Sequence, residues 1–281
     1  MKNKLIHRLT GTALMLSMNA AQAAISCNIS SPGFIFGYDN TLQNIVQTSY
    51  SITCTRGVDA TDPTTTTYAV RANNGLTPAV NNNQAASGAN RLRYDTFTSN
   101  TCGTQWRNNP TIPSTAGTIT MTGLLPTTVT QTFWGCSNAG LLPTAGIYTD
   151  TVTMTPTYSA GVLGGTGTFP VKIITPATCT ISAIPSITLA YGNALRLTPA
   201  TATTSAPVTC SNQLPYTLAV SPTRGVSAGI YYTLSLPGSA TGTGAVQNIT
   251  ITATAQAGQA GTCSTSSCIG AAQSHTLTVT Y

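Results

Sequence analysis

The chain of 281 residues contains no glutamate, and its acidic residues are five aspartates. Two histidines are present, and His275 is the only one beyond the first 23 positions. General acid–base catalysis commonly uses carboxylates and histidines held close together. No paired carboxylates, Ser-His-Asp arrangement or Gly-x-Ser-x-Gly motif stands out in the sequence. We therefore predict that the protein is not an enzyme.

The sequence also lacks the patterns of metal, cofactor and nucleic-acid sites. No Cys-x-x-Cys pair occurs, so the spacing typical of metal ligands is missing and we expect no cofactor. The basic residues beyond position 23 are scattered and are not interleaved with aromatic residues. Nucleic-acid binding requires a clustered basic stripe, so we expect no nucleic-acid partner.

Residues 1–23 have the features of a secretory signal peptide. Basic residues stand within the first eight positions, an apolar run covers residues 9–18, and Ala21-Gln22-Ala23 is a typical cleavage site. The apolar run is shorter than the roughly 20 residues that span a bilayer. A retained membrane anchor is the alternative. We expect a soluble protein that is secreted through the periplasm.

All eight cysteines lie beyond the signal peptide, and in an exported protein disulfides are the default. Two of the expected pairs tie a first strand to its neighbour, a third is a longer staple, and a fourth closes a small loop. Other connectivities of eight cysteines stay open. The hypothesised pairs are Cys27–Cys54, Cys102–Cys136, Cys179–Cys210 and Cys263–Cys268.

Short alternating segments separated by glycine, proline and asparagine clusters predict an all-β protein. An internal duplication is visible, since residues 25–30 match 177–182 and residues 50–54 match 207–210. A repeat of this length indicates tandem domains. About seven strand candidates per copy predict two Ig-like antiparallel β-sandwiches. The predicted domains are the signal peptide 1–23, an N-terminal sandwich 24–174 and a C-terminal sandwich 175–281.

The two copies end differently. Residues 274–281 alternate, with Leu277, Val279 and Tyr281 on one face. The similar stretch 146–158 is followed by a glycine-rich turn and another apolar run, 169–174. The second sandwich is therefore predicted to lack its final strand and to accept one from another chain, in a groove lined by those three residues. The alternative is that an earlier segment of the same copy closes the sheet.

Cleavage after Ala23 would leave three residues before Cys27. Such an extension is too short to be donated to a neighbour, so we expect a subunit that accepts a strand but donates none. A subunit of that kind occupies one end of a polymer.

These motifs resemble a known family. The Cys27-Asn28-Ile29-Ser30 opening, the turn at Phe36-Gly37-Tyr38 and the closing strand Tyr148–Thr153 are similar to the spore coat protein U-like domain, the pilin module of archaic (Csu-type) chaperone–usher pili. The second copy departs from the first in lacking a counterpart of Trp134-Gly135. The resemblance implies Ig-like sandwiches, a periplasmic Ig-like assembly chaperone that lends a strand, an outer-membrane usher and an adjacent pilin subunit.

For a two-domain member without a donor extension, the resemblance implies a tip adhesin at the cell surface that attaches to abiotic or host surfaces and supports biofilm formation. A structural pilin or a spore-coat-like surface subunit without an adhesive role is the alternative.

Surface contacts are expected in loops of the first sandwich. Gly-Leu-Leu-Pro-Thr occurs at residues 123–127 and again at 140–144, and Gly75–Pro78 is a shorter relative. Their leucines either project as an apolar patch or cap the core. Trp134 is expected in the core beside a disulfide, and Trp106, in a polar run, is expected to be exposed and available to a glycan. The candidate contact residues are Leu76, Trp106, Leu124, Leu125, Leu141 and Leu142.

Overall fold

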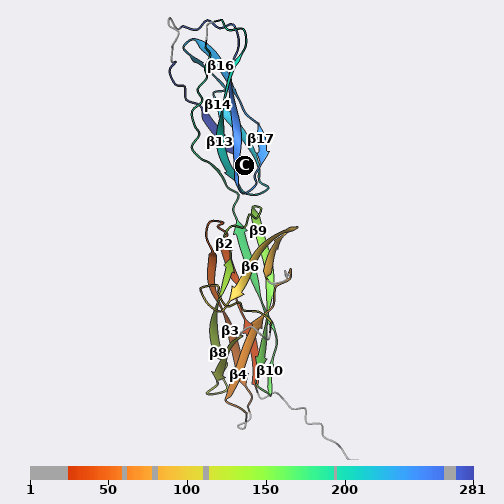
Figure 1. Ribbon diagram of the computed structural model, residues 1–281. Helices are drawn as coiled ribbons and strands as arrows, with labels where there is room; N and C mark the ends of the chain where they lie inside the picture. The colour runs from red at the N-terminus through yellow and green to blue at the C-terminus, as the bar shows by residue number, and fades with distance from the viewer. Residues whose placement is uncertain (1–24, 59–61, 78–81, 110–113, 193–194, 263–269) are drawn as a thin grey trace, which may run out of the picture.

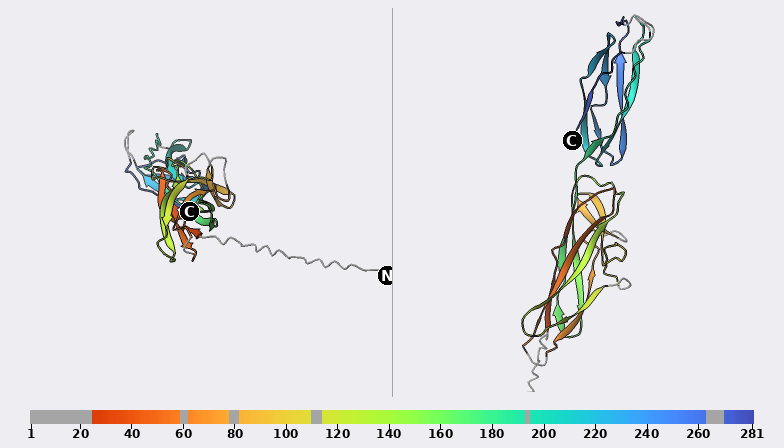
Figure 2. Two further views of the ribbon diagram at one scale, coloured as in Figure 1. Left: turned by 90° about the horizontal axis from the view of Figure 1, so that it is seen from below. Right: turned by 90° about the vertical axis from the view of Figure 1, so that its left-hand side faces the viewer.

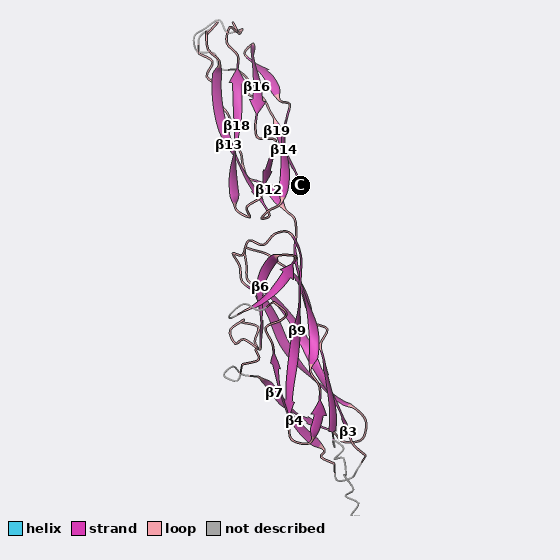
Figure 3. Cartoon of the chain, turned by 90° about the vertical axis from the view of Figure 1, so that its right-hand side faces the viewer, coloured by secondary structure: helices cyan, strands magenta, loops and turns pink. Residues whose placement is uncertain are grey.

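The computed structural model describes residues 25–58, 62–77, 82–109, 114–192, 195–262 and 270–281. All regular secondary structure in these ranges is β-strand (Figure 3), which confirms the predicted all-β class. The strands form two elongated units placed end to end and joined by one connection (Figure 1), and the side view in Figure 2 shows the same arrangement. The described ranges contain no helix with the length and apolarity needed to cross a membrane.

The N-terminal unit comprises β1 to β11. Its path of paired strands runs β10-β1-β3-β8-β6-β5-β9-β11-β2, with β4 pairing to β7 and β9. The strands are β1 (Ile25–Ser30), β2 (Phe34–Gly37), β3 (Asn44–Arg56), β4 (Thr65–Ala72), β5 (Asn83–Ser87), β6 (Asn90–Phe97), β7 (Thr115–Thr120), β8 (Thr127–Ser137), β9 (Gly146–Tyr158), β10 (Val162–Gly164) and β11 (Gly167–Thr175).

The C-terminal unit comprises β12 to β19 in two sheets, ordered β12-β13-β18-β16-β15 and β17-β14-β19. The strands are β12 (Cys179–Ile181), β13 (Ala200–Cys210), β14 (Pro215–Ser221), β15 (Arg224–Ser227), β16 (Ile230–Ser235), β17 (Ser239–Thr241), β18 (Val246–Ala255) and β19 (Thr276–Thr280).

Each unit has its own buried apolar cluster. Alternation places every second strand residue inward, and the N-terminal core is dominated by aromatic rings. Phe133 lies 4.8 Å from Trp106 and 5.1 Å from Phe169 between ring centroids. The C-terminal cluster is smaller and is built mainly from aliphatic residues such as Val208 and Ile251.

Contacts that recur in both units show which strands correspond. The hydroxyl of Tyr38 accepts the Leu141 N–H at 3.0 Å, and the hydroxyl of Tyr191 accepts the Gln259 N–H at 2.9 Å. Strand pairing agrees: β4 lies between β7 and β9, as β14 lies between β17 and β19. Among the described residues, β2, β10 and β11 have no strand counterpart in the C-terminal unit.

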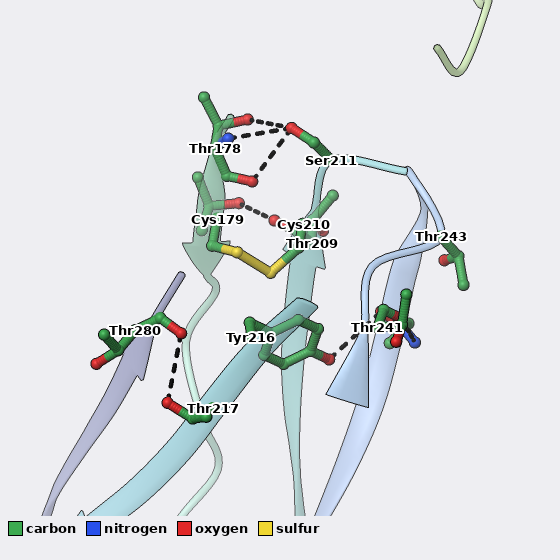
Figure 4. The surroundings of a disulfide bond; sticks show 12 residues. Thr178, Cys179, Thr209, Cys210, Ser211, Tyr216, Thr217, Thr241, Thr243 and Thr280 are labelled. Carbon is green, nitrogen blue, oxygen red and sulfur yellow. Dashed lines mark hydrogen bonds between the residues drawn. A yellow bond between two sulfur atoms is a disulfide. The ribbon is translucent and has the colours of Figure 1, made fainter. Parts of the chain in front are cut away.

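Three disulfides lie in the described residues: Cys27–Cys54, Cys102–Cys136 and Cys179–Cys210. The first and third join directly opposite residues of neighbouring strands. Figure 4 shows Cys179–Cys210 tying β12 to β13 at one end of the C-terminal unit. The hypothesised pair Cys263–Cys268 lies outside the described residues.

Candidate functional site

The last strand of the N-terminal unit fills a gap between two other strands. β11 pairs antiparallel with β9 and parallel with β2. Its inward side chains are at most 1% exposed: Phe169, Val171 and Ile173. Pro170 and Lys172 alternate with them on the outer face. Because both edges of β11 are paired and its inner face is buried, the N-terminal unit is closed.

No described strand fills the corresponding gap in the C-terminal unit. In the N-terminal unit, Tyr68 of β4 is paired with Tyr158 of β9. In the C-terminal unit, Thr217 of the corresponding strand β14 is paired with Thr280 of β19. When the two pairs of strands are aligned, Tyr281, the residue after Thr280, takes the place of Tyr158. By this correspondence, the part of β9 that pairs with β11 matches residues 270–277. Residues 270–275 form no strand, and β19 pairs with β14 alone among the described strands.

The opposite border of the gap is also irregular. Tyr191 corresponds to Tyr38, so residues 187–190 take the place of β2, and they form no strand. We refer to the space bordered by residues 187–190 and 270–277 as the open slot. Ile187 and Leu277 pack against the C-terminal core but are only partly buried, whereas Phe34 of β2 is buried. The open slot thus exposes core side chains that β11 covers in the other unit.

The three predicted groove residues occupy different environments. Leu277 borders the open slot, and Val279 packs partly buried against the C-terminal core. Tyr281 is 58% exposed. Thr280 lies beside Thr217 of β14, as Figure 4 shows. Residues 270–273 precede the alternating stretch 274–281, so only the correspondence with β9 identifies them as part of the slot border.

One end of the N-terminal unit is apolar. Leu124 and Leu125 project from the loop between β7 and β8, and Leu125 is 81% exposed. The loop is fixed by Met121, which is fully buried and whose N–H donates to Thr64 O at 2.7 Å. The loop precedes β8, whereas Leu142, which follows the other end of β8, contacts Asn212 of the C-terminal unit. The loop therefore lies at the end remote from the C-terminal unit, the lower end in Figure 1.

Two exposed residues that the sequence interpretation missed lie at the same end. Val58 follows β3, and Leu163 lies in β10, which pairs with β1 next to the end of β3. We call Val58, Leu124, Leu125 and Leu163 the apolar end. The three segments are far apart in the sequence and are brought together by strand pairing, so no local motif marks them as a group.

The second Gly-Leu-Leu-Pro-Thr motif lies at the opposite end of the N-terminal unit. Leu142 O accepts a hydrogen bond from Asn212 Nδ2 of the C-terminal unit at 2.8 Å, and Thr144 forms a bridge with Asn212. Leu141 is partly buried against the N-terminal core. The two motifs therefore lie at opposite ends of the N-terminal unit, separated by the length of β8, and do not form one patch.

Leu76 is 73% exposed in a third place, on the loop after β4. Asp150 holds this loop: its Oδ1 accepts the Leu76 N–H at 2.8 Å, and its Oδ2 accepts from the Tyr94 hydroxyl at 2.7 Å. Burial, followed by the charge of Asp150, raises the pKa of Tyr94. This carboxylate therefore positions the loop.

The order of burial of the two tryptophans is the reverse of the expected one. Trp106 is fully buried, stacks on Tyr50 with centroids 5.3 Å apart, and donates Nε1–H to Val70 O at 2.8 Å. It reaches the core because backbone pairing of Trp106 with Thr96 and the Cys102–Cys136 disulfide draw its loop across the sheet. Trp134 is half-buried, since alternation along β8 gives the inward position to Phe133. Trp106 is thus unavailable to a glycan.

Within the described part of the chain, no three His, Cys, Asp or Glu side chains lie close enough together to hold a metal ion.

The fold is that of an all-β protein built from two modular sandwiches, with disulfides in both. The family model of the Spore Coat Protein U domain matches residues 12–155, just over half of the chain. The chain belongs to this family. The match ends within β9, so β11 and the C-terminal unit lie outside it.

Solved structures with similarity to the chain include the CsuC–CsuE chaperone–tip adhesion subunit pre-assembly complex from archaic chaperone–usher Csu pili of Acinetobacter baumannii. Identity is 13% over 91% of this chain and 100% of that chain, with a TM-score of 0.46. The CupB6 tip adhesin from Pseudomonas aeruginosa is 9% identical over 92% of this chain and 94% of that chain, with a TM-score of 0.43. No curated protein matches the chain.

Proposed function

We propose that the protein is a non-enzymatic tip adhesin of an archaic chaperone–usher pilus, exported by a signal peptide at 1–23. The proposed domains are an adhesive sandwich at 24–174 and a strand-accepting sandwich at 175–281. The observation that carries this proposal is the difference between the units: β11 closes the first, while the open slot of the second exposes partly buried core residues.

The open slot is proposed as the joint to the filament. An extended segment from a partner would supply backbone hydrogen bonds to residues 270–277 and apolar side chains to the core beside them. A periplasmic Ig-like chaperone would occupy the slot first, and an adjacent pilin would replace it at the outer-membrane usher. An exposed core surface of this kind favours aggregation unless it is covered.

A co-purification tests the pilus pathway. The chain, tagged at its mature N-terminus, is recovered from its own periplasm and its partners are identified. We expect a stoichiometric Ig-like chaperone. A matched control carries a copy of residues 159–175 after Tyr281, which would fill the slot with a strand like β11 and exclude the chaperone. Recovery of the unmodified chain as a stable monomer contradicts the proposal.

The apolar end is proposed as the adhesive surface. Exposed apolar side chains lose contact with water when they meet a hydrophobic surface, and a fully buried leucine contributes about 1.5–3 kcal/mol. The double variant Leu124→Ser/Leu125→Ser should therefore reduce attachment of pili to polystyrene at least about tenfold. The control is Leu195→Ser/Leu197→Ser, since these leucines are also exposed but belong to the C-terminal unit.

This comparison separates the adhesin from the alternative, a structural pilin or coat-like subunit. Both roles predict chaperone capture, and only the adhesin predicts that the apolar end matters for attachment. Equal attachment by the wild type and Leu124→Ser/Leu125→Ser, with pili assembled in equal number, would favour the structural role.

A further inference from the structure

An inserted loop gives the N-terminal unit a cavity on its side. Residues 98–114 connect β6 to β7, whereas residues 236–238 connect the corresponding β16 and β17. A cavity of about 510 Å³ lies under the described part of this loop, between it and the ends of β6 and β8. Cavities of this volume are typical of small-molecule sites. Its wall includes Arg93, Asp95, Phe97, Gln105 and Asn138.

The loop that covers this cavity is held at several points. Cys102 is bonded to Cys136 of β8, and the Thr98 N–H donates to Thr104 O at 3.0 Å. The Trp106 N–H donates to Thr96 O at 2.8 Å, and its ring is buried in the core. A wall fixed by a disulfide and a buried ring keeps its shape, as a binding site requires.

The charges in the wall are unevenly balanced. Asp95 is buried and accepts hydrogen bonds from Arg107 at 2.7 Å and from Gln105 Nε2 at 3.0 Å. Burial raises the pKa of Asp95, and the contact with Arg107 opposes that shift. Arg107 thus pairs directly with the Asp95 carboxylate, and the charge of Arg93 also opposes the rise in its pKa. Arg93 is exposed at the cavity and adds a further positive charge.

We propose that this cavity binds a carboxylate-bearing sugar, such as a uronic or sialic acid unit of a surface polysaccharide. The Arg93 guanidinium would pair with the carboxylate, a match in shape as well as charge. The amides of Gln105 and Asn138 offer donors and acceptors to ring hydroxyls, and Phe97 provides an apolar wall. The cavity is separate from the apolar end, so sugar binding in the cavity would act in addition to the proposed attachment through the apolar end.

Titration of the purified full chain with free sugars, followed by NMR, tests the inference without an attachment assay. The probes are D-glucuronate, D-galacturonate and N-acetylneuraminate at millimolar concentrations, with D-glucose and methyl D-glucuronate ester as neutral counterparts. We expect at least one acid to shift signals of residues around the cavity and to bind at least tenfold more tightly than the neutral sugars.

Arg93→Gln should weaken binding of the acid at least tenfold and leave the melting temperature unchanged, because the side chain is exposed. Arg91→Gln is the matched control, since Arg91 is exposed on the same strand and does not border the cavity. Asn138→Asp, which adds a negative charge at the cavity, should also weaken it. Absence of binding by all three acids, equal binding of neutral sugars, or an unchanged affinity in Arg93→Gln overturns the proposal.

Discussion

Appending a copy of residues 159–175 to Tyr281 is predicted to close the C-terminal unit. Tyr281 takes the place of Tyr158, so the copied hairpin would return the copied strand into the open slot in the register that β11 has in the N-terminal unit. The copies of Phe169, Val171 and Ile173 would then face the partly buried side chains of the C-terminal core.

The expected increase in the free energy of unfolding follows from the burial of these three side chains. Each contributes about 1.5–3 kcal/mol when fully buried, so together they contribute about 4–9 kcal/mol as an upper estimate. A domain of this size gains roughly 4–8 °C in melting temperature per kcal/mol. Even if half of the gain is lost to ordering the new strand, the transition of the C-terminal unit should rise by more than about 8 °C.

Calorimetry of the extended chain measures this gain, and amide hydrogen exchange locates it. Amides of residues 270–277 should become protected, because they would pair with the new strand. The matched control is the same extension with its three inward residues changed to threonine, which keeps length and β-propensity but removes the apolar side chains. Equal melting temperatures for the two extensions would refute the assignment of the slot.

Two further predictions concern the N-terminal core. Phe169→Ala should destabilise this unit by about 3–5 kcal/mol because it removes a ring from a closed core, whereas Lys172→Ala, on the outer face of the same strand, should be nearly neutral; urea unfolding measures both, and equal effects would contradict the burial pattern. Trp106→Ala should likewise cost about 3–5 kcal/mol, and Trp134→Ala about 1 kcal/mol; the reverse order in thermal unfolding would show that Trp134 is the core residue.

The candidate sites were only partly predictable from local patterns. Alternation in the last eight residues predicts a strand with one inward face, and Leu277 does border the open slot. Residues 270–273, which also border the slot, precede this alternating stretch, and their role depends on a partner strand and not on their own pattern. Leu124 and Leu125 are recognisable as a turn motif, but Val58 and Leu163 join them only through the pairing of β1 with β3 and β10.

Composition and periodicity determined the all-β class, because a period of two with abundant turn residues is incompatible with helices. The duplication is also recognisable from the sequence alone, since both copies contain strand segments with cysteine, tyrosine and threonine in the same order. Only the tertiary structure decided which side chains face outward. Trp106 is buried because the Cys102–Cys136 disulfide and the backbone hydrogen bond from Trp106 to Thr96 hold its loop across the sheet. The two identical Leu-Leu-Pro motifs lie at opposite ends of β8. Exposure depends on contacts between segments distant in the chain, and a local pattern carries no information about those contacts.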